Sequence, residues 1–174
     1  MKRTLAVALV LFSFAGAAFA GGLSISLSVK DSRTSAGPHR ELRDARMTIV
    51  SRDGTTALML LDSSIAVQLT DRALAQMKTD ETKKAGEEKG FFEELIEAAV
   101  LGGVKFAAGK SIEFPIAAIR SVDYSNDEVR LLTDKNERAI EELKVNHVDE
   151  LRNFAPADAV RFVNALRAAK AARK

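Results

Sequence analysis

The chain has 174 residues, and its 26 basic side chains nearly balance its 24 acidic ones, which gives a formal net charge of +2. A composition of 47% hydrophobic and 29% charged residues is typical of a globular protein and excludes disordered, collagen-like and polytopic membrane classes. The absence of cysteine excludes disulfide scaffolds, zinc ribbons, iron–sulfur clusters and thiol chemistry.

Residues 1–20 have the pattern of a cleavable signal peptide. A positively charged start, Lys2-Arg3, precedes an apolar run over 5–14, and the small-x-small pattern of 18–20 predicts cleavage before Gly21. No cysteine follows to accept a lipid, and no later run is long and apolar enough to span a bilayer. We therefore expect a periplasmic or secreted protein. Two basic residues, Lys2 and Arg3, are removed with the leader, so the basic and acidic side chains of the mature chain balance. This balance argues against nucleic-acid binding.

Residues 21–45 are predicted to form an N-terminal arm and linker. Apolar residues alternate at period two over 23–29, which is a strand pattern, whereas 31–46 is polar and contains Gly37-Pro38. The arm has two possible partners, its own domain or another molecule, to either of which it would add a strand.

The next segment reads as an antiparallel meander of three strands. A strand over 47–50 leads to Asp53-Gly54, a strong hairpin signal, and a second strand over 55–61 is followed by a turn over 62–64. A third strand covers 65–69. The residues after it either continue this strand to Leu74 or begin a helix over 71–78 with Thr70 as its N-cap.

An amphipathic helix is predicted over residues 90–110. Apolar side chains recur there at helical spacing, and the glutamates at 93, 94 and 97 share the opposite face. These acidic residues make a membrane span implausible. Gly102-Gly103 is read as a helix-packing or helix-ending pair, not as a phosphate loop.

The last third is predicted to contain short strands and a closing helix. Strands are expected over 111–116, 119–124, 128–133, 140–145 and 150–154, with turns at 125–127, 134–137 and 146–147. Pro115 restricts its strand to an edge or a bulge. Pro156 is a favourable first residue for the helix, with Asp158 in its first turn.

About seven short strands followed by one helix resemble the pleckstrin-homology-like (PH-like) superfold, in particular the small bacterial PH-like and GRAM-like domains. Ile65–Leu74 is similar to their strand with an L-T-D-x-x-L stretch, and Phe114–Val122 to their P-L-x-x-I-x-x-V strand. Phe154–Phe162 is similar to the entry of their capping helix. The resemblance covers about residues 46–171, with 79–110 inserted.

This resemblance implies an α+β fold in which two nearly orthogonal antiparallel sheets close into a β-barrel and the C-terminal helix plugs one open end. It also favours a strand at 69–74. Domains of this kind bind lipid head groups or peptides or self-associate, and they are not typically catalytic.

Two groups of residues are candidate binding sites. Phe91, Phe92, Leu95 and Ile96 form the apolar face of the predicted insertion helix, which either packs on the barrel or contacts a partner protein, a second copy or a membrane interface. A second group is basic; it is either a solvated, self-compensating charge distribution, which is the favoured interpretation, or a contact for an anionic lipid or envelope polymer, and it comprises Arg40, Arg43, Arg46 and Arg52.

No catalytic, metal or cofactor site is predicted. Glu93 and Glu97 lie one helical turn apart, but with no third ligand or base nearby a solvated acidic face is the better interpretation. His39 and His147 are interpreted as surface histidines. The sequence therefore predicts a non-enzymatic exported interaction module that binds a protein partner or forms a homo-oligomer, with peripheral binding to an anionic surface as the alternative.

Overall fold

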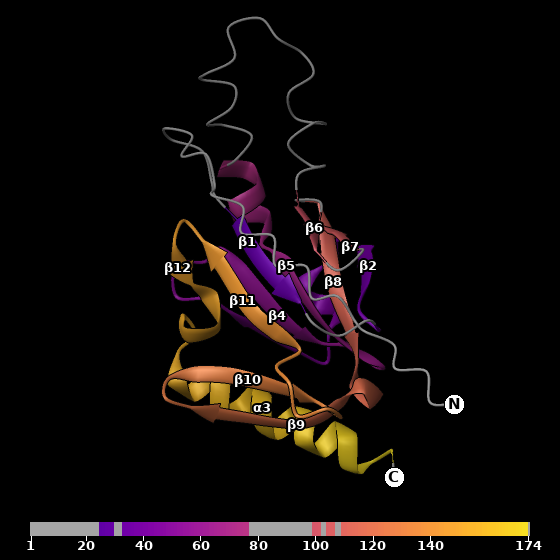
Figure 1. The fold of residues 1–174 in the computed structure, drawn as a ribbon. Helices are drawn as coiled ribbons and strands as arrows, with labels where there is room; N and C mark the ends of the chain where they lie inside the picture. Colours follow the sequence, from indigo (N-terminus) through magenta and orange to yellow (C-terminus); the bar gives the residue numbers. More distant parts are fainter. Residues whose placement is uncertain (1–24, 30–32, 77–98, 102–103, 107–108, 174) are drawn as a thin grey trace, which may run out of the picture.

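The computed structural model describes residues 25–29, 33–76, 99–101, 104–106 and 109–173. Its fold is mixed α+β, with mostly antiparallel sheets and a helix at the C-terminal end (Figure 1). None of the helices in these ranges has the length and apolar character that spanning a bilayer requires. The elements are β1 (Ile25–Val29), β2 (Ser35–Pro38), η1 (Leu42–Asp44), β3 (Met47–Val50), β4 (Thr56–Leu60), β5 (Ser64–Leu69), β6 (Ala99–Leu101), β7 (Val104–Phe106), β8 (Lys110–Pro115), η2 (Ile116–Ala118), β9 (Ile119–Ser125), β10 (Glu128–Thr133), β11 (Ile140–Val145), β12 (Val148–Asp149), η3 (Glu150–Arg152) and α3 (Pro156–Ala171).

The largest sheet has five antiparallel strands in the order β2-β8-β5-β4-β3. The predicted meander is confirmed as β3, β4 and β5, with Gly54 in the first turn at a φ of 76°, a conformation that glycine adopts without steric cost. β8 pairs with β5 although residues 70–109 separate the two strands. Pro115 is the last residue of β8. The pairing of β8 with β2 stops at Glu113, so no strand on that side needs a backbone N–H at Pro115.

A second group of strands follows in the last third of the chain. β9 and β10 form the predicted hairpin around Asn126 and Asp127, whose positive φ values of 54° and 58° match the right-handed twist of the strands. The residues just before β11 touch β10, since the amide of Ala139 donates to the carbonyl of Leu131 over 2.8 Å and Arg138 forms an isolated bridge with Leu132. The N-terminal arm adds its strand here, because β1 pairs with β11.

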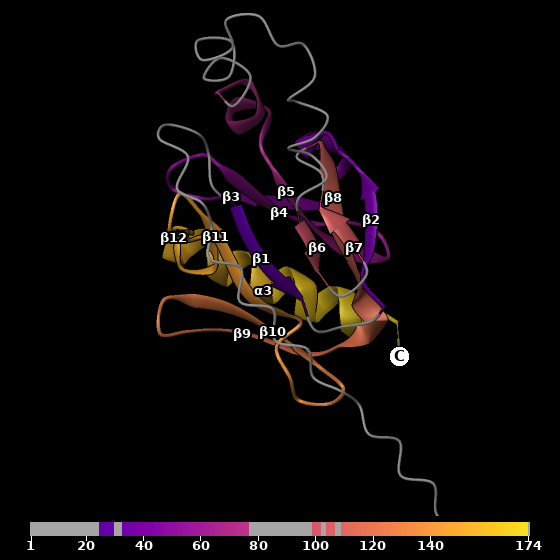
Figure 2. The same ribbon diagram turned by 45° about the horizontal axis from the view of Figure 1, so that its top comes forward.

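The hydrophobic core lies between these sheets and α3. The predicted stripe on α3 is confirmed, because Ala159, Phe162, Val163 and Leu166 are all buried. The helix lies along the β9–β10 hairpin (Figures 1 and 2), and the guanidinium of Arg167 donates to the carbonyl of Val122 on β9 over 2.9 Å. Burial of this one face therefore fixes α3 on the sheets.

The segment after β5 turns into a helix, so the strand that the resemblance favoured at 69–74 ends at Leu69. Residues 71–76 are helical, and Thr70 is the N-cap, because its hydroxyl accepts a hydrogen bond from the amide of Ala73 over 3.2 Å. The same hydroxyl donates to the carbonyl of Gly54 over 2.5 Å. This cap anchors the start of the 70–109 connection to the β3–β4 turn.

Two further predictions of secondary structure are wrong. The helix expected over 90–110 is not formed at 99–101 and 104–106, where β6 and β7 pair as an antiparallel hairpin. The strand expected over 150–154 is instead η3, which the carboxylate of Asp149 caps by accepting from the amide of Leu151 over 3.2 Å. The described strands form four separate hydrogen-bonded sheets, and no closed barrel is found among them.

Candidate functional site

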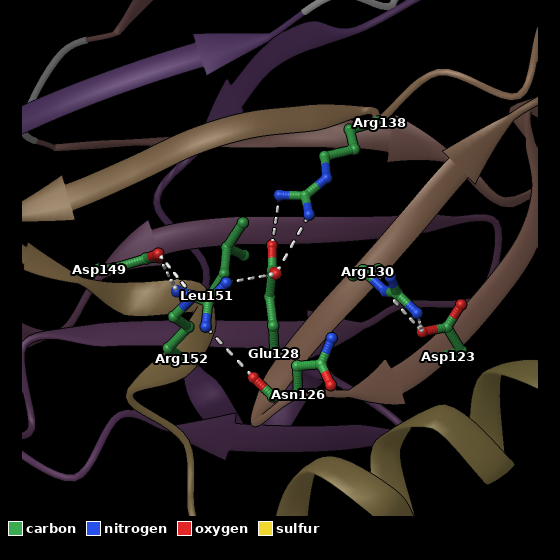
Figure 3. Close-up of polar contacts among 8 residues, drawn as sticks. All are labelled: Asp123, Asn126, Glu128, Arg130, Arg138, Asp149, Leu151 and Arg152. Carbon is green, nitrogen blue, oxygen red and sulfur yellow. Dashed lines mark hydrogen bonds and ion pairs between the residues drawn. The ribbon is translucent and has the colours of Figure 1, made fainter.

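Three polar loops meet at one end of the fold. They are the β3–β4 turn (51–55), the β9–β10 turn and the segment from β12 through η3 to α3. Figure 3 shows the part of this region around Glu128. We call it the η3 corner; its residues are 51–56, 126–128, 138 and 149–153.

Glu128, the first residue of β10, is the centre of an ion-pair network in the η3 corner. Its side chain is 4% exposed and accepts hydrogen bonds from Arg138 at 2.5 and 3.2 Å and from Arg152 at 3.1 Å (Figure 3). Both arginines are partly exposed, at 39% and 51%. A carboxylate removed from water is costly unless it is paired in this way, so the network fixes the two arginine-bearing loops on β10.

Arg152 extends this network to the neighbouring loops. Its guanidinium donates to the carbonyl of Asn126 over 3.3 Å and lies 3.3 Å from the carboxylate of Asp149. One side chain on η3 therefore contacts the tip of the β9–β10 hairpin, the first residue of β10 and the cap of its own 3-10 helix.

The β3–β4 turn carries its own acid, Asp53. Its Oδ1 accepts hydrogen bonds from the hydroxyl of Ser51 at 2.7 Å and from the amide and hydroxyl of Thr55 at 3.0 and 2.8 Å. Desolvation acts to raise the pKa of Asp53, but these hydrogen bonds outweigh it and lower that pKa below its ordinary value of 3.8. Asp53 is therefore held as a carboxylate.

Glu150, the first residue of η3, is completely buried next to this turn. Burial raises the pKa of Glu150 above its ordinary value of 4.5, and the charge of Asp53 raises it further. Hydrogen bonds with nearby hydroxyls of the β3–β4 turn offset part of this effect. The pKa values of the two acids are thus shifted in opposite directions, that of Asp53 downward and that of Glu150 upward.

Backbone contacts hold the β3–β4 turn against the loop that follows η3. The amide of Arg52 donates to the carbonyl of Asn153 over 2.7 Å, and Ser51 forms an isolated antiparallel bridge with Phe154. Within the turn, the hydroxyl oxygen of Ser51 accepts from the amides of Thr55 and Thr56 at 3.1 and 2.9 Å.

The structure does not bring the four predicted arginines together. Arg40 binds Glu113 on β8 at 2.7 and 3.1 Å. Arg43 is paired with its neighbour Glu41, and Arg46 binds Asp62 at the β4–β5 turn at 2.7 Å. Arg52 lies at the opposite end of β3, in the η3 corner. Because three of the four already contact a carboxylate, their positive charge is largely compensated where they lie.

The predicted aromatic site, Phe91, Phe92, Leu95 and Ile96, lies outside the described residues, as do Glu93 and Glu97. His39 is not a free surface residue, because its Nε2 lies 2.8 Å from the carboxylate of Asp71. His147 lies in the β11–β12 turn and is exposed. Within the described ranges, no group of three or more acidic, histidine or cysteine residues is placed to bind a metal ion.

Sequence reasoning missed both buried acids of the η3 corner. Glu128 follows a turn signal and Glu150 was expected in a strand, and neither position has a local pattern that predicts burial. Their surroundings include residues distant in the sequence: Arg152 donates to Glu128, and Ser51 lies near enough to Glu150 to lower its pKa.

Comparison with protein-family models, with curated proteins and with solved structures finds no significant match to this chain.

Proposed function

We propose that this protein is an exported, non-enzymatic interaction module, and that the connection between β5 and β8 (residues 70–109) contacts a partner protein or a second copy. The observation that carries the proposal is the length of this connection. β5 and β8 are hydrogen-bonded antiparallel neighbours, with Val67 opposite Ile112. Such neighbours are ordinarily joined by a loop of about two to five residues.

A connection this long is not needed to pair the two strands. Longer loops add little to the entropy cost of closure, so the sheet tolerates an insertion here. Long connections in compact domains are either functional or linker segments, and this one carries structure of its own, a helix at 71–76 and the β6–β7 hairpin. The first part of the connection is fixed on the fold by Thr70 and by the buried side chain of Ala73. The apolar residues of the predicted site, from Phe91 to Ile96, follow further along it.

The order of the strands supports the resemblance to PH-like domains. The four-stranded meander β3-β4-β5-β8 is followed by β9, β10 and β11 and then by α3. In this scheme two nearly orthogonal sheets form a barrel that α3 closes, β1 and β2 are added edge strands, and the connection is an insertion between two strands of the first sheet. Such a barrel is a scaffold that displays the inserted segment.

Binding to an anionic lipid or envelope polymer is the weaker alternative. It requires the four arginines to present net positive charge, whereas Glu113, Glu41 and Asp62 each pair with one of them. A compensated surface attracts an anionic surface less strongly than an uncompensated cluster would.

Site-specific photo-crosslinking in cells tests the proposal. A photoreactive residue replaces Leu95, and a matched control places it at Lys135, an exposed turn residue outside the connection. We expect a crosslinked adduct at position 95 and none at position 135, and its mass distinguishes a second copy from another protein. Absence of an adduct at position 95, together with salt-sensitive pelleting of the leaderless protein on anionic vesicles, would replace this function with the alternative.

A further inference from the structure

The N-terminal strand β1 has one edge without a hydrogen-bonded strand partner. The strand order of its sheet is β1-β11-β12, so β11 pairs with one edge of β1 and no described strand pairs with the other. A strand edge of this kind presents unpaired N–H and C=O groups, which form a template for another extended segment. The free edge of β1 can therefore accept a further strand.

Several other edge strands of the described sheets carry features that discourage such pairing. β2 ends in Pro38, which has no N–H to donate, and a carbonyl of β9, that of Val122, is already bound by Arg167 of α3. The residue after β3, Ser51, is bridged to Phe154. The sequence of β1 is Ile-Ser-Leu-Ser-Val, which contains no charged residue, glycine or proline. β1 thus lacks the residues that protect natural sheet edges.

The bulge in this sheet lies on β11 and leaves β1 regular. Ser28 lies opposite Glu142 and Val29 opposite Ile140, so the unmatched residue of the bulge is Glu141. Successive side chains of β1 therefore alternate between its two faces without interruption.

The two faces of β1 differ in character. Leu27 is buried in the hydrophobic core, and Ile25 and Val29 pack against the same core. Ser26 and Ser28 share the opposite, polar face. A strand added to the free edge must match this alternation, because a wrong register places apolar side chains on the polar face.

The alternation in β1 is symmetric about Leu27. When two copies of β1 run antiparallel with Leu27 opposite its counterpart, Ile25 lies opposite Val29 and Ser26 opposite Ser28. Apolar residues then continue the core face, serines continue the polar face, and no like charges are opposed. The outward N–H and C=O groups belong either to residues 25, 27 and 29 or to 26 and 28, and both sets are symmetric about Leu27.

We propose that the free edge of β1 binds β1 of a second copy about a two-fold axis at Leu27. The two three-stranded sheets then join into one sheet of order β12-β11-β1-β1-β11-β12. Two-fold symmetry is the commonest symmetry of protein dimers, and it requires a surface that is complementary to itself. The pattern of β1 meets this requirement.

The connection between β5 and β8 lies next to this edge. β6, which is part of the connection, lies near β1 although the two strands belong to different sheets. A pair of five-residue strands buries less than the about 1,200 Å² of a stable interface, so the dimer needs further contacts. These come from the connection; the inference rests on the proposed function in this respect, and it names a second copy as the partner.

Engineered cysteines test the register, because the chain has no cysteine of its own. Ser26→Cys is mixed with a differently tagged Ser28→Cys under mild oxidation. Residues directly opposite in an antiparallel pair have Cα atoms about 4.5–5.5 Å apart, which suits a disulfide, whereas two copies of residue 26 lie on a diagonal of about 7–8 Å. We expect the mixed disulfide to form. Ser121→Cys, at an exposed position of β9, is the control and forms none with either variant.

Charge variants of β1 test association in solution, measured by analytical ultracentrifugation of the purified protein. In Ser26→Lys/Ser28→Lys each new lysine lies opposite a lysine of the second copy, so the dissociation constant of the dimer rises about tenfold or more. Ser26→Glu/Ser28→Lys instead opposes unlike charges in the dimer, and within one copy it faces Lys144 and Glu142 of β11. Its dissociation constant stays near that of the wild type. Urea unfolding checks that both variants are folded.

A wild type that remains monomeric overturns the inference and assigns the edge of β1 to its neighbour β6. A dimer that lacks the mixed disulfide, or that both charge variants leave unchanged, also overturns it. If a photoreactive residue at position 95 is still crosslinked to a different protein, the proposed function stands while this inference fails. The mixed disulfide together with loss of association in Ser26→Lys/Ser28→Lys supports the dimer, and it does so whether or not position 95 is crosslinked.

Discussion

Replacing Glu128 with glutamine tests whether the ion-pair network of the η3 corner stabilises the fold. The substitution keeps the shape of the side chain but removes its charge, and it turns one acceptor into a donor that faces an arginine. A hydrogen bond to a charged group contributes about 1.5–3 kcal/mol, against about 0.5–1.5 kcal/mol for a neutral one. Three such bonds are present, from Arg138 and Arg152.

The expected loss of stability is smaller than three times the difference between a hydrogen bond to a charged group and a neutral one. Arg138 and Arg152 are partly exposed, so water solvates their guanidinium groups in the variant. We therefore expect Glu128→Gln to lower the free energy of unfolding by about 2 kcal/mol, which moves the urea midpoint by about 1 M for a slope near 2 kcal/mol/M.

Urea unfolding followed by circular dichroism measures this loss in the purified protein. Glu41→Gln is the matched control, because the same change is made in an exposed pair with Arg43 and is expected to cost under about 0.5 kcal/mol. A double-mutant cycle with Arg138→Met isolates the pairwise contribution. The reasoning is refuted if Glu128→Gln is no more destabilising than Glu41→Gln.

Urea unfolding also measures four further predictions. Gly37→Ala should cost about 1–2 kcal/mol, because its Cβ would lie 2.3 Å from Glu113 Oε1, and the cost should shrink in a Glu113→Ala background. Asn126→Val should cost about 1–2 kcal/mol at a φ of 54°, whereas Asn126→Gly should cost nothing; equal losses would contradict the turn assignment. Phe162→Ala should cost about 3–5 kcal/mol by leaving a cavity under α3, and a loss below 1 kcal/mol would show that the helix is not docked. Glu150→Gln should stabilise the protein at pH 7 and have no effect near pH 4, because burial and the charge of Asp53 raise the pKa of Glu150; a pH-independent difference would contradict this sign.

Much of the strand order was predictable, because turns leave strong local signals. Asp53-Gly54 and Asn126-Asp127 require backbone conformations that few residue types adopt, so they fix where the strands reverse. Pro156 and the apolar spacing after it likewise locate α3.

The errors occurred where local patterns were ambiguous. Gly102-Gly103 separates two short apolar segments, which is a two-residue hairpin signal, but the apolar residues around it also recur at helical spacing, so the pattern is compatible with both structures. At 69–76, Thr70 was a valid helix N-cap, and a tertiary hydrogen bond to Gly54 accompanies it in the structure. The buried acids of the η3 corner depend on contacts between distant segments, which no single window of sequence contains.

Pairing between β1 and β11 has a consequence for how the protein folds. The hydroxyl of Ser26 binds the carboxylate of Glu142 over 2.6 Å across 116 residues of chain. Contacts of such high sequence separation raise the contact order and slow folding, since the chain loses entropy before the contact forms. During synthesis on the ribosome β1 emerges before β11 and has an unpaired edge until β11 follows, and such edges promote aggregation. The arm is thus the segment that most needs protection while the rest of the chain is still emerging.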